Sequence, residues 1–428
     1  MKCNYACGSQ EHGLARRSFL GTMLGAGASA GLGTLVRPAA AEELQRQQKR
    51  VLVCYLAGGV SQLETWDPKP RTDTGGPFRA IPTSVPGVHI SELLPHTAQQ
   101  MHRLMLVRGV NTNENDHGKG SYIMQTGRRR EPSTDYPYMG SLAARLLAPE
   151  GAALPGYIHI TPGGGGSISA GEAAFLGPRY APVVLGNGNP PQNTALPDAV
   201  SVTSDAARQS LRRQQDERFL RRRRTALTEA YTSTYDQAAA LMAQREVFDV
   251  SKESEQDHER YGTHDFGRHC LLARRLLENG VTFVKVSHSN YDTHNENFNF
   301  HIEQLGEFDR TFATLINDLA DRGLLESTLV LVLSEFGRTP RINHLYGRDH
   351  WGTAWSIAMS GCGLQLGGTV GATNDNGTEV VDRQVDGGHL FHTYLRALGF
   401  DPTDQLTVDG RPVQIADPAA EAIEEVLA

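Results

Sequence analysis

Histidine and acidic side chains concentrate in three polar segments of this sequence, at residues 111–121, 287–297 and 334–352. Histidine nitrogens combined with carboxylate oxygens are typical ligands of zinc, and they also suit manganese or iron. Any one of these histidines alone is more often a helix cap or a satisfied polar side chain. The three segments together supply His117, His288, Asp292, His294, Glu335, Asp349 and His350. They predict a divalent-metal site, with zinc, manganese and calcium as candidate ions and with these ligands: Asp292, His294, Glu335, Asp349 and His350.

The elements that position these segments are short apolar runs, which are typical of buried parallel strands. Strands are predicted at residues 51–56, 104–110, 156–160, 281–286 and 328–333. Helical spacing of apolar residues predicts helices at 268–279 and 300–322, each followed by a glycine. Strands that alternate with helices predict an α/β domain with a mainly parallel sheet. Ligands of such sheets bind beyond the carboxyl ends of the strands, where the polar segments begin.

Two further stretches differ in composition from the rest. Residues 205–260 are charged, helix-prone and free of glycine, and they predict a helical insertion of one or two long exposed helices. The basic run at 212–224 is interpreted as a solvated helix face rather than a nucleic-acid site. Residues 160–200 are rich in Gly, Pro and Asn and predict a long loop.

The chain begins with a pattern typical of an export signal. Arg16 and Arg17 precede a weakly apolar stretch at 21–36, which ends in the small residues Ala39, Ala40 and Ala41. A basic start, an apolar stretch and an Ala-x-Ala site predict a signal peptide, and the arginine pair predicts the twin-arginine route. We expect a signal at 1–41, a single domain at 42–428 without a transmembrane span, and a periplasmic or extracellular location.

Charge and cysteine content narrow the function classes. The net charge is −7, and the first 41 residues carry four basic side chains against one acidic, so the remainder is near −10. This charge argues against a nucleic-acid partner. Three of the five cysteines follow the predicted signal, at Cys54, Cys270 and Cys362. Their wide spacing predicts buried free thiols rather than a disulfide framework.

Four ordered motifs resemble the DUF1501 family of exported bacterial proteins. They are Gly58-Gly-x-Ser61 with Asp67-Pro-Lys-Pro70, Tyr291-Asp-Thr-His294, Glu335-Phe-Gly-Arg-Thr-Pro340 and Gly347-Arg-Asp-His-Trp351. The resemblance covers nearly the whole chain after the signal. It implies the fold of the alkaline phosphatase and sulfatase superfamily, a doubly wound α/β/α sandwich with metals at the strand ends. It implies no particular reaction, because the family is named for unknown function.

Compared with sulfatases, the ligand set is altered. His117 lies near the position of the sulfatase nucleophile, upstream of Gln125-Thr-Gly127. The sulfatase Ser-Asp-His-Gly segment corresponds to Ser334-Glu-Phe-Gly337, so that Glu335 would replace an Asp ligand while Phe336 cannot replace the His. The first strand lacks the usual terminal Asp, which Glu64 or Asp67 would have to supply. His301, His389 and His392 are expected to support the site rather than form it.

Two functions follow from these residues. The first is a metal-dependent hydrolase of phosphate or sulfate esters with a diverged site, in which Ser61, Ser121 or an activated water attacks the ester. Arginines would hold an anionic ester or a sulfated or phosphorylated polymer. The catalytic candidates are Ser61, His117, Arg338 and Arg348. The alternative is a catalytically inactive, sulfatase-like protein that binds anionic glycans or a cell-surface partner.

Overall fold

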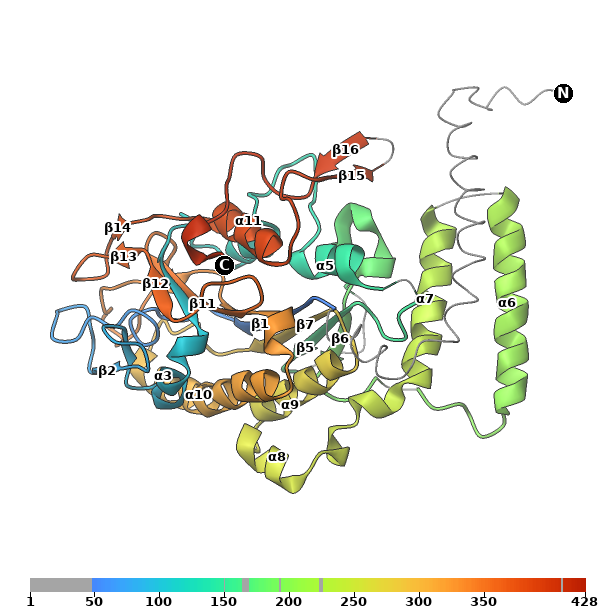
Figure 1. The fold of residues 1–428 in the computed structure, drawn as a ribbon, viewed down its shortest axis with the longest axis horizontal. Coiled ribbons are helices and arrows are strands. Elements are labelled where there is room, and N and C mark those ends of the chain that lie inside the picture. The colour runs from blue at the N-terminus through green and yellow to red at the C-terminus, as the bar shows by residue number, and fades with distance from the viewer. Residues whose placement is uncertain (1–47, 150, 164–168, 192–193, 223–225, 409–410) are drawn as a thin grey trace. The chain divides into compact units, whose positions relative to one another are not determined.

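The run predicted as the first strand, β1 (Arg50–Leu56), lies fully buried inside an eight-stranded sheet. The computed structural model describes residues 48–428 except 150, 164–168, 192–193, 223–225 and 409–410. Residues 48–428 form one unit, which Figure 1 shows as a ribbon. The signal predicted at 1–41 lies outside the described residues.

The strand order of the sheet is β12-β4-β11-β8-β1-β7-β5-β6. All neighbours pair in parallel except the two pairs made by β11, which runs antiparallel to β4 and β8. This arrangement confirms the predicted α/β class with a mainly parallel sheet. The strands besides β1 are β4 (Met105–Val110), β5 (Tyr157–Thr161), β6 (Val183–Gly186), β7 (Phe283–His288), β8 (Thr328–Leu333), β11 (Trp355–Gly361) and β12 (Gly368–Val370).

All five predicted strands are present in the eight-stranded sheet, but its other three strands, β6, β11 and β12, were not predicted. The prediction of a long loop at 160–200 was wrong, because this stretch contains β6 and the short 3-10 helices η2 (Ala170–Leu176) and η3 (Pro178–Tyr180). Strand β6 is only four residues long, with three apolar side chains, and it lies among glycines and prolines. Strands β11 and β12 each contain glycine and a hydroxyl residue, which weakened the apolar signal.

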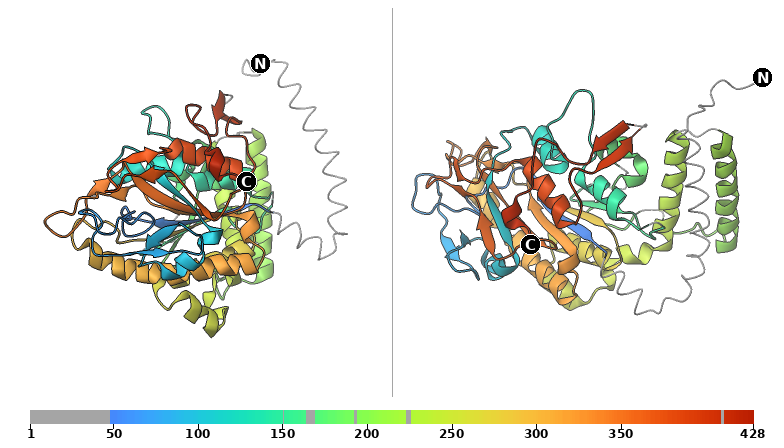
Figure 2. Two further views of the ribbon diagram at one scale, coloured as in Figure 1. Left: turned by 60° about the vertical axis from the view of Figure 1, so that its left-hand side comes forward. Right: turned by 45° about the horizontal axis from the view of Figure 1, so that its top comes forward.

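Alternate residues of the central strands face two separate cores, as expected for strands buried on both sides. On one face, Leu52 and Val284 pack among side chains of α9 (Asp265–Glu278) and α10 (Asn297–Asp321). On the other face, Val53 and Phe283 pack beneath α4 (His117–Thr126), α5 (Met139–Leu147) and α11 (Gly387–Ala397). Figures 1 and 2 show these helices on opposite sides of the sheet.

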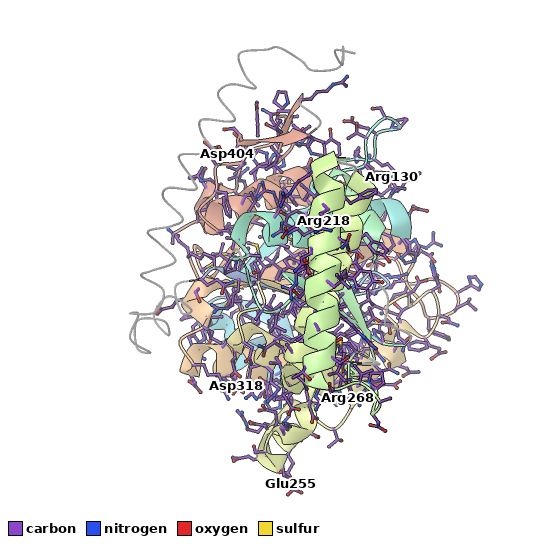
Figure 3. All side chains as sticks on the ribbon, turned by 90° about the vertical axis from the view of Figure 1, so that its right-hand side faces the viewer. Arg130, Arg218, Glu255, Arg268, Asp318 and Asp404 are labelled. Carbon is purple, nitrogen blue, oxygen red and sulfur yellow. The ribbon has the colours of Figure 1, made fainter. Side chains whose placement is uncertain are left out.

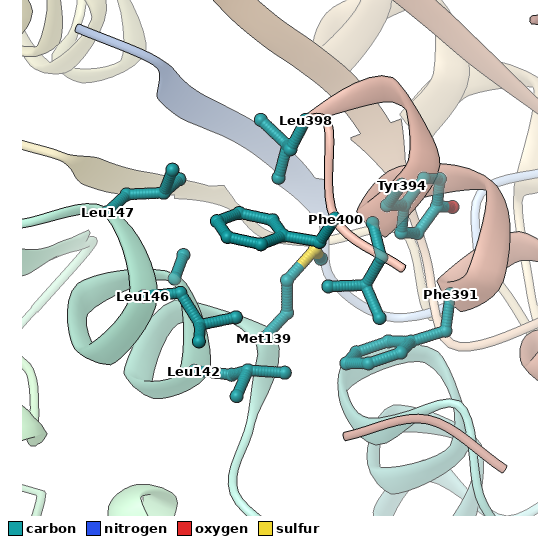
Figure 4. A pocket seen from close by; sticks show the side chains of 10 residues that line it. Met139, Leu142, Leu146, Leu147, Phe391, Tyr394, Leu398 and Phe400 are labelled. Carbon is teal, nitrogen blue, oxygen red and sulfur yellow. The ribbon is translucent and has the colours of Figure 1, made fainter. Parts of the chain in front are cut away.

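The contact between α5 and α11 is apolar. Leu142 and Leu146 face Phe391, Tyr394 and Leu398 around a cavity of about 10 Å³, as Figure 4 shows. A space of this size holds at most one water molecule and has only apolar walls, so we interpret it as imperfect packing rather than a ligand site.

The helical insertion contains two long helices, α6 (Val202–Arg222) and α7 (Ala226–Ala243), followed by η4 (Arg245–Phe248), η5 (Val250–Lys252) and α8 (Glu255–Tyr261). Helix α6 is largely exposed, and Figure 3 shows it lengthwise with Arg218 on its surface. Its least exposed positions include Arg212, which pairs with Asp216 and with Asp236 of α7. The prediction of long exposed helices therefore agrees with the structure. Every helix among the described residues is too short or too polar to cross a membrane.

Smaller elements complete the fold. Helix α3 (Pro95–Gln99) and η1 (Met101–Arg103) precede β4, while η6 (Leu325–Ser327) precedes β8 and η7 (Glu424–Val426) lies near the end. Two-stranded ribbons are formed by β2 (Ala80–Pro82) with β3 (His89–Ser91), β9 (Gly337–Arg338) with β10 (His350–Trp351), β13 (Ala372–Thr373) with β14 (Val380–Asp382), and β15 (Gln405–Val408) with β16 (Arg411–Gln414). Cys54, Cys270 and Cys362 are buried free thiols, as predicted.

Candidate metal site

The loops that follow β1, β7 and β8 meet at the carboxyl edge of the sheet, because these three strands are parallel neighbours. The turn after β1 depends on Gly58, which has a φ of +118°. A β-carbon at this position would lie 2.4 Å from the backbone nitrogen of Asp292. Only glycine allows this approach, which brings the β1 and β7 loops together. On the far side of β8, the ribbon of β9 and β10 places His350 opposite Arg338.

Three histidines surround the carboxylate of Asp292. The Nε2 atoms of His294 and His350 lie 3.2 and 3.1 Å from Asp292 Oδ1, and they lie 3.0 Å from each other. His117, at the first turn of α4, places its Nε2 atom 3.3 Å from Asp292 Oδ2. His117, Asp292 and His350 each offer a ligand atom within 4.8 Å of the other two. We call these four residues the Asp292 cluster.

Each histidine of the Asp292 cluster has an acceptor at its other ring nitrogen. Nδ1 of His117 lies 2.8 Å from Glu335 Oε1, and Nδ1 of His294 lies 2.8 Å from Asp349 Oδ1. Nδ1 of His350 lies 2.6 Å from the carbonyl oxygen of Asn115. A neutral histidine that donates from Nδ1 keeps a lone pair on Nε2. The three lone pairs are thereby directed toward Asp292.

Arg338 contacts the Asp292 carboxylate from the protein interior. Its side chain is fully buried, and its Nη2 atom donates to Asp292 Oδ1 at 2.6 Å. The guanidinium also donates to the carbonyl oxygens of Gly58, Gly59 and Arg348. Burial opposes ionisation of Asp292, but the hydrogen bond from Arg338, the contact with His350 and the charge of Arg338 outweigh it and lower the Asp292 pKa to about 2. Arg338 therefore keeps Asp292 charged and also anchors the turn after β1.

Glu335 and Asp349 differ in their surroundings. Glu335 has only 6% of its side chain exposed, and it also accepts from the Gly58 backbone at 2.9 Å and from Ser334 Oγ at 3.1 Å. Burial raises its pKa, but the His117 hydrogen bond and the backbone donors lower it below the usual range overall. Asp349 is 56% exposed, and its hydrogen bond with His294 lowers its pKa. The Glu335 hydrogen bond in turn raises the pKa of His117.

The structure brings seven of the nine predicted site residues to this edge of the sheet. His117, Asp292, His294 and His350 face the centre, and Arg338 supports Asp292 from within the protein. Glu335 and Asp349, which were predicted as ligands, instead contact the outer nitrogens of two histidines. Sequence analysis did not identify the supporting carbonyl of Asn115, because a backbone acceptor leaves no trace in residue type.

Two predicted residues point elsewhere. Arg348 is fully buried and forms an ion pair with Glu64, which is also fully buried. Ser61 is likewise fully buried, with its backbone N–H donating to His301 Nε2 at 3.2 Å. Neither side chain reaches solvent, so neither is placed to attack or hold a substrate at the Asp292 cluster. His288 also turns inward, toward Tyr291 and Glu307.

The three histidines that were expected to support the site, His301, His389 and His392, contact other parts of the fold. His301 accepts from Ser61 and contacts the Asn297 carbonyl, which fixes the turn after β1 against α10. His389 forms a capping box with Asp386 at the start of α11, and His392 contacts the carbonyl oxygen of Asp417. Phe336, at the position of a sulfatase histidine, is buried and packs against the rings of His117 and His350.

The fold and this cluster define an α/β protein with a candidate metal site at the carboxyl edge of a mainly parallel sheet. The chain belongs to the DUF1501 family, a family described as proteins of unknown function, which matches residues 48–427. No curated protein matches the chain in sequence.

Several solved structures are similar in fold. A protein of the alkaline phosphatase superfamily from Vibrio parahaemolyticus is 11% identical over 83% of this chain and 67% of its own, with a TM-score of 0.36. The sulfatase PsFucS1 from Pseudoalteromonas sp. is 13% identical over 84% and 69%, with a TM-score of 0.40. The alkaline phosphatase of the Antarctic bacterium TAB5 is 13% identical over 82% and 98%, with a TM-score of 0.35. Similarities this low carry no argument about activity, which must come from the site itself.

Proposed function

We propose that this protein is a metal-dependent hydrolase of phosphate or sulfate esters, with its metal held by His117, Asp292, His294 and His350. One observation carries the proposal. The Nε2 atoms of His294 and His350 face each other at 3.0 Å, while both Nδ1 atoms already have acceptors. Two lone pairs at this distance repel each other unless a cation lies between them, and that cation is either a proton or a metal ion.

The distances among the donor atoms fit a metal ion. Tetrahedral zinc with bonds of about 2.0–2.1 Å holds its ligand atoms about 3.3 Å apart. The triangle of His294 Nε2, His350 Nε2 and Asp292 Oδ1 has edges of 3.0, 3.1 and 3.2 Å. Acceptors behind each ligating histidine are also the usual environment of metal sites. The donor set suits zinc, and manganese or calcium remain candidates because the carboxylate contributes a hard ligand.

A bound divalent ion would supply a Lewis acid that polarises the ester and activates water. The protein contributes the remaining parts. Glu335 and Asp349 orient two of the ligands, and Arg338 keeps Asp292 ionised at neutral pH. Phe336 forms an apolar wall behind two histidine rings. About half of the side chains of Asp292 and His294 is exposed, which leaves one side of the site open to a substrate.

The location of the protein belongs to the same proposal. The Arg16-Arg17 pair and the Ala-rich site that follows support export by the twin-arginine route, which carries folded proteins. A metal bound by residues from the whole length of the fold would then be inserted before export. The substrates would be anionic esters available outside the cytoplasm, such as sulfated or phosphorylated polymers.

Elemental analysis of the purified full chain tests the proposal. We expect close to one divalent ion per chain, together with hydrolysis of p-nitrophenyl phosphate or p-nitrophenyl sulfate that chelator abolishes and zinc or manganese restores. The double variant Asp292→Ala with His350→Ala should lose both metal and activity. His102→Ala, which removes an exposed histidine bonded to Ser84, is the matched control and should retain both. A metal-free protein that gains no activity from either ion would contradict the proposal.

A further inference from the structure

Three neighbouring strands place polar side chains on a face of the sheet that is otherwise apolar. Tyr55 of β1 lies opposite Ser287 of β7, and Lys285 of β7 lies opposite His159 of β5. These positions share the face of Val53 and Phe283, which belong to the core beneath α4, α5 and α11. The His159 Nε2 and Ser287 Oγ atoms lie 2.9 Å apart. We call Tyr55, Ser121, His159, Lys285 and Ser287 the Lys285 pocket.

Lys285 is the unusual member of this group. It is 5% exposed, and its ammonium lies 4.4 Å from the centre of the Tyr55 ring. Among the described residues, no oxygen accepts a hydrogen bond from its Nζ atom, and no carboxylate lies within 4.0 Å of it. Lysine is almost never buried without a partner, because an unpaired charge in the interior is costly. Burial accordingly lowers the pKa of Lys285.

Tyr55 has an unused polar group beside the same ammonium. Its hydroxyl is buried and has no hydrogen-bond partner in the described part of the chain, although Ser121 and Glu335 lie near it. Ser121 stands one helical turn after His117 on α4. Glu335 contacts both His117 and the turn after β1. The Tyr55 hydroxyl therefore lies beside two residues, Ser121 and Glu335, that are neighbours of His117.

The nearby carboxylates are committed to other groups. Glu172 accepts a hydrogen bond from Tyr157 at 2.8 Å, and Glu335 accepts from His117, Gly58 and Ser334. Both contribute favourable long-range attraction to Lys285 without contacting it. The ammonium and the Tyr55 hydroxyl thus offer hydrogen-bond donors that the described residues do not use. These donors would pair best with an oxygen acceptor that carries a negative charge.

We propose that the Lys285 pocket binds an oxyanion, a carboxylate or a sulfate carried by the substrate in addition to the ester group that reaches the Asp292 cluster. That this ligand is a substrate rests on the proposed function, whereas the binding of an oxyanion at Lys285 does not. Lys285 provides the charge, and Tyr55 and Ser287 provide hydroxyl donors at the ends of two adjacent strands. A ligand with two anionic groups would span the two sites, and the pocket would select it over an ester with a single anionic group.

Titration calorimetry on the metal-free full chain tests the pocket directly, with sodium sulfate and sodium acetate as probes at constant ionic strength. Lys285→Met keeps the length of the side chain and removes a buried charge, so we expect it to fold and to unfold at a higher temperature. It should weaken binding of the preferred probe by about ten-fold or more, the usual range for a lost charged hydrogen bond. Lys119→Met, at an exposed lysine on α4, is the matched control and should change affinity less than two-fold.

The two probes separate the two sources of the oxyanion. Tighter binding of sulfate would indicate a sulfated ligand, and tighter binding of acetate would indicate an acidic sugar or other carboxylate. Tyr55→Phe should weaken the same probe by a smaller factor. Equal affinities in wild type and Lys285→Met, or no measurable binding of either probe to the wild type, would overturn the proposal.

Asp292→Asn, measured in the same titration, separates this inference from the proposed function. This variant should bind the oxyanion at least as tightly as the wild type, because its change lies outside the Lys285 pocket and removes a negative charge. Lysine-dependent binding in a protein without metal or esterase activity would support the pocket and contradict the hydrolase. Metal-dependent esterase activity in a protein whose oxyanion binding does not depend on Lys285 would support the hydrolase and contradict the pocket.

Discussion

The five residues of the Gly347–Trp351 motif contribute to two charged regions with opposite properties. Arg348 turns inward to Glu64, whose carboxylate it meets at 2.8 and 3.1 Å, and neither side chain is exposed. The remaining donors of Arg348 meet the carbonyl oxygens of Thr74, Thr339 and Pro340. His350, two residues later, turns outward to the Asp292 cluster.

The two regions differ in whether their hydrogen-bonding groups are used. Every donor of the buried pair has an acceptor, so this pair holds loops together and has nothing left to offer a ligand. In the Asp292 cluster, nitrogen lone pairs converge on a carboxylate, and the side chains of His117, Asp292 and His294 are nearly half exposed. Charged groups that are fully satisfied and buried indicate structure. Groups of the same kind that face each other at an open edge indicate a binding site.

The largest effect should come from breaking the buried pair. Glu64→Ala leaves Arg348 as an unpaired charge in the interior, which destabilises a fold by about 3–5 kcal/mol. Urea unfolding followed by circular dichroism measures this loss. The double variant Glu64→Leu with Arg348→Met should recover part of it, because it removes both charges but leaves three carbonyl oxygens without their Arg348 donor. A loss below about 1 kcal/mol in Glu64→Ala would show that solvent reaches the pair.

The same kind of change in the Asp292 cluster should affect metal binding more than stability. Asp292→Ala removes a ligand from a half-exposed site, so we expect zinc affinity to fall by at least about 100-fold. The free energy of unfolding of the metal-free protein should fall by less than in Glu64→Ala, because the buried Arg338 loses its carboxylate but keeps the carbonyl oxygens of Gly58, Gly59 and Arg348 as acceptors. Competition with a chromophoric chelator measures the affinity. A loss of stability as large as that of Glu64→Ala would remove the distinction between the two regions.

A smaller effect is expected from the acceptors behind the histidines. Glu335→Gln should reduce zinc affinity by about 10–100-fold, the range for residues that orient a ligand. Asp349→Asn should fall at the low end of that range, because Asp349 is 56% exposed and Glu335 is 6% exposed. The same chelator competition ranks the two variants. The reverse order would show that Asp349 rather than Glu335 determines the geometry of the site.

The smallest effect concerns the pH dependence of the buried pair. Burial opposes ionisation of Glu64, but the charges of Arg348 and His301 lower its pKa below the ordinary 4.5 overall. A carboxyl group whose pKa is lower in the folded state stabilises the fold above its unfolded pKa, and this contribution is lost as pH falls through the folded value. The stability difference between wild type and Glu64→Gln should be constant from pH 8 to about 5 and shrink below about 4.5. Urea unfolding at each pH checks this, and a difference independent of pH would contradict the low pKa.

Much of the fold was readable from the sequence because parallel strands buried on both sides are continuous apolar runs. Strand β8, with the sequence TLVLVL, is the clearest case. Strand β6 was missed because three apolar residues among glycines resemble a loop. Strand β11 was missed because it contains Ser356, Ser360 and Gly361. Register with β4 and β8, rather than local composition, makes it a strand.

The sequence predicted most of the residues that gather at this edge of the sheet, and their roles stay predictions. His117 was assigned to catalysis and Glu335 to the metal, and in the structure the Glu335 carboxylate contacts the Nδ1 atom of His117. Residue type cannot distinguish an inner ligand from the acceptor that orients it, since both are His or carboxylate. Likewise, the direction of each side chain in Arg348-Asp349-His350 depends on the ribbon of β9 and β10, which forms only in the folded chain.

The antiparallel strand β11 lies between β4 and β8 and so joins parts of the chain separated by more than 200 residues. Helix α4, which carries His117, follows β4, and the ribbon that carries His350 directly precedes β11. Contacts of such high sequence separation form late in folding. His117 can therefore join Asp292, His294 and His350 at one ion only after β4 has paired with β11. Metal capture by all four residues would then report completed folding, because a chain without β4 in the sheet would offer the other three without His117.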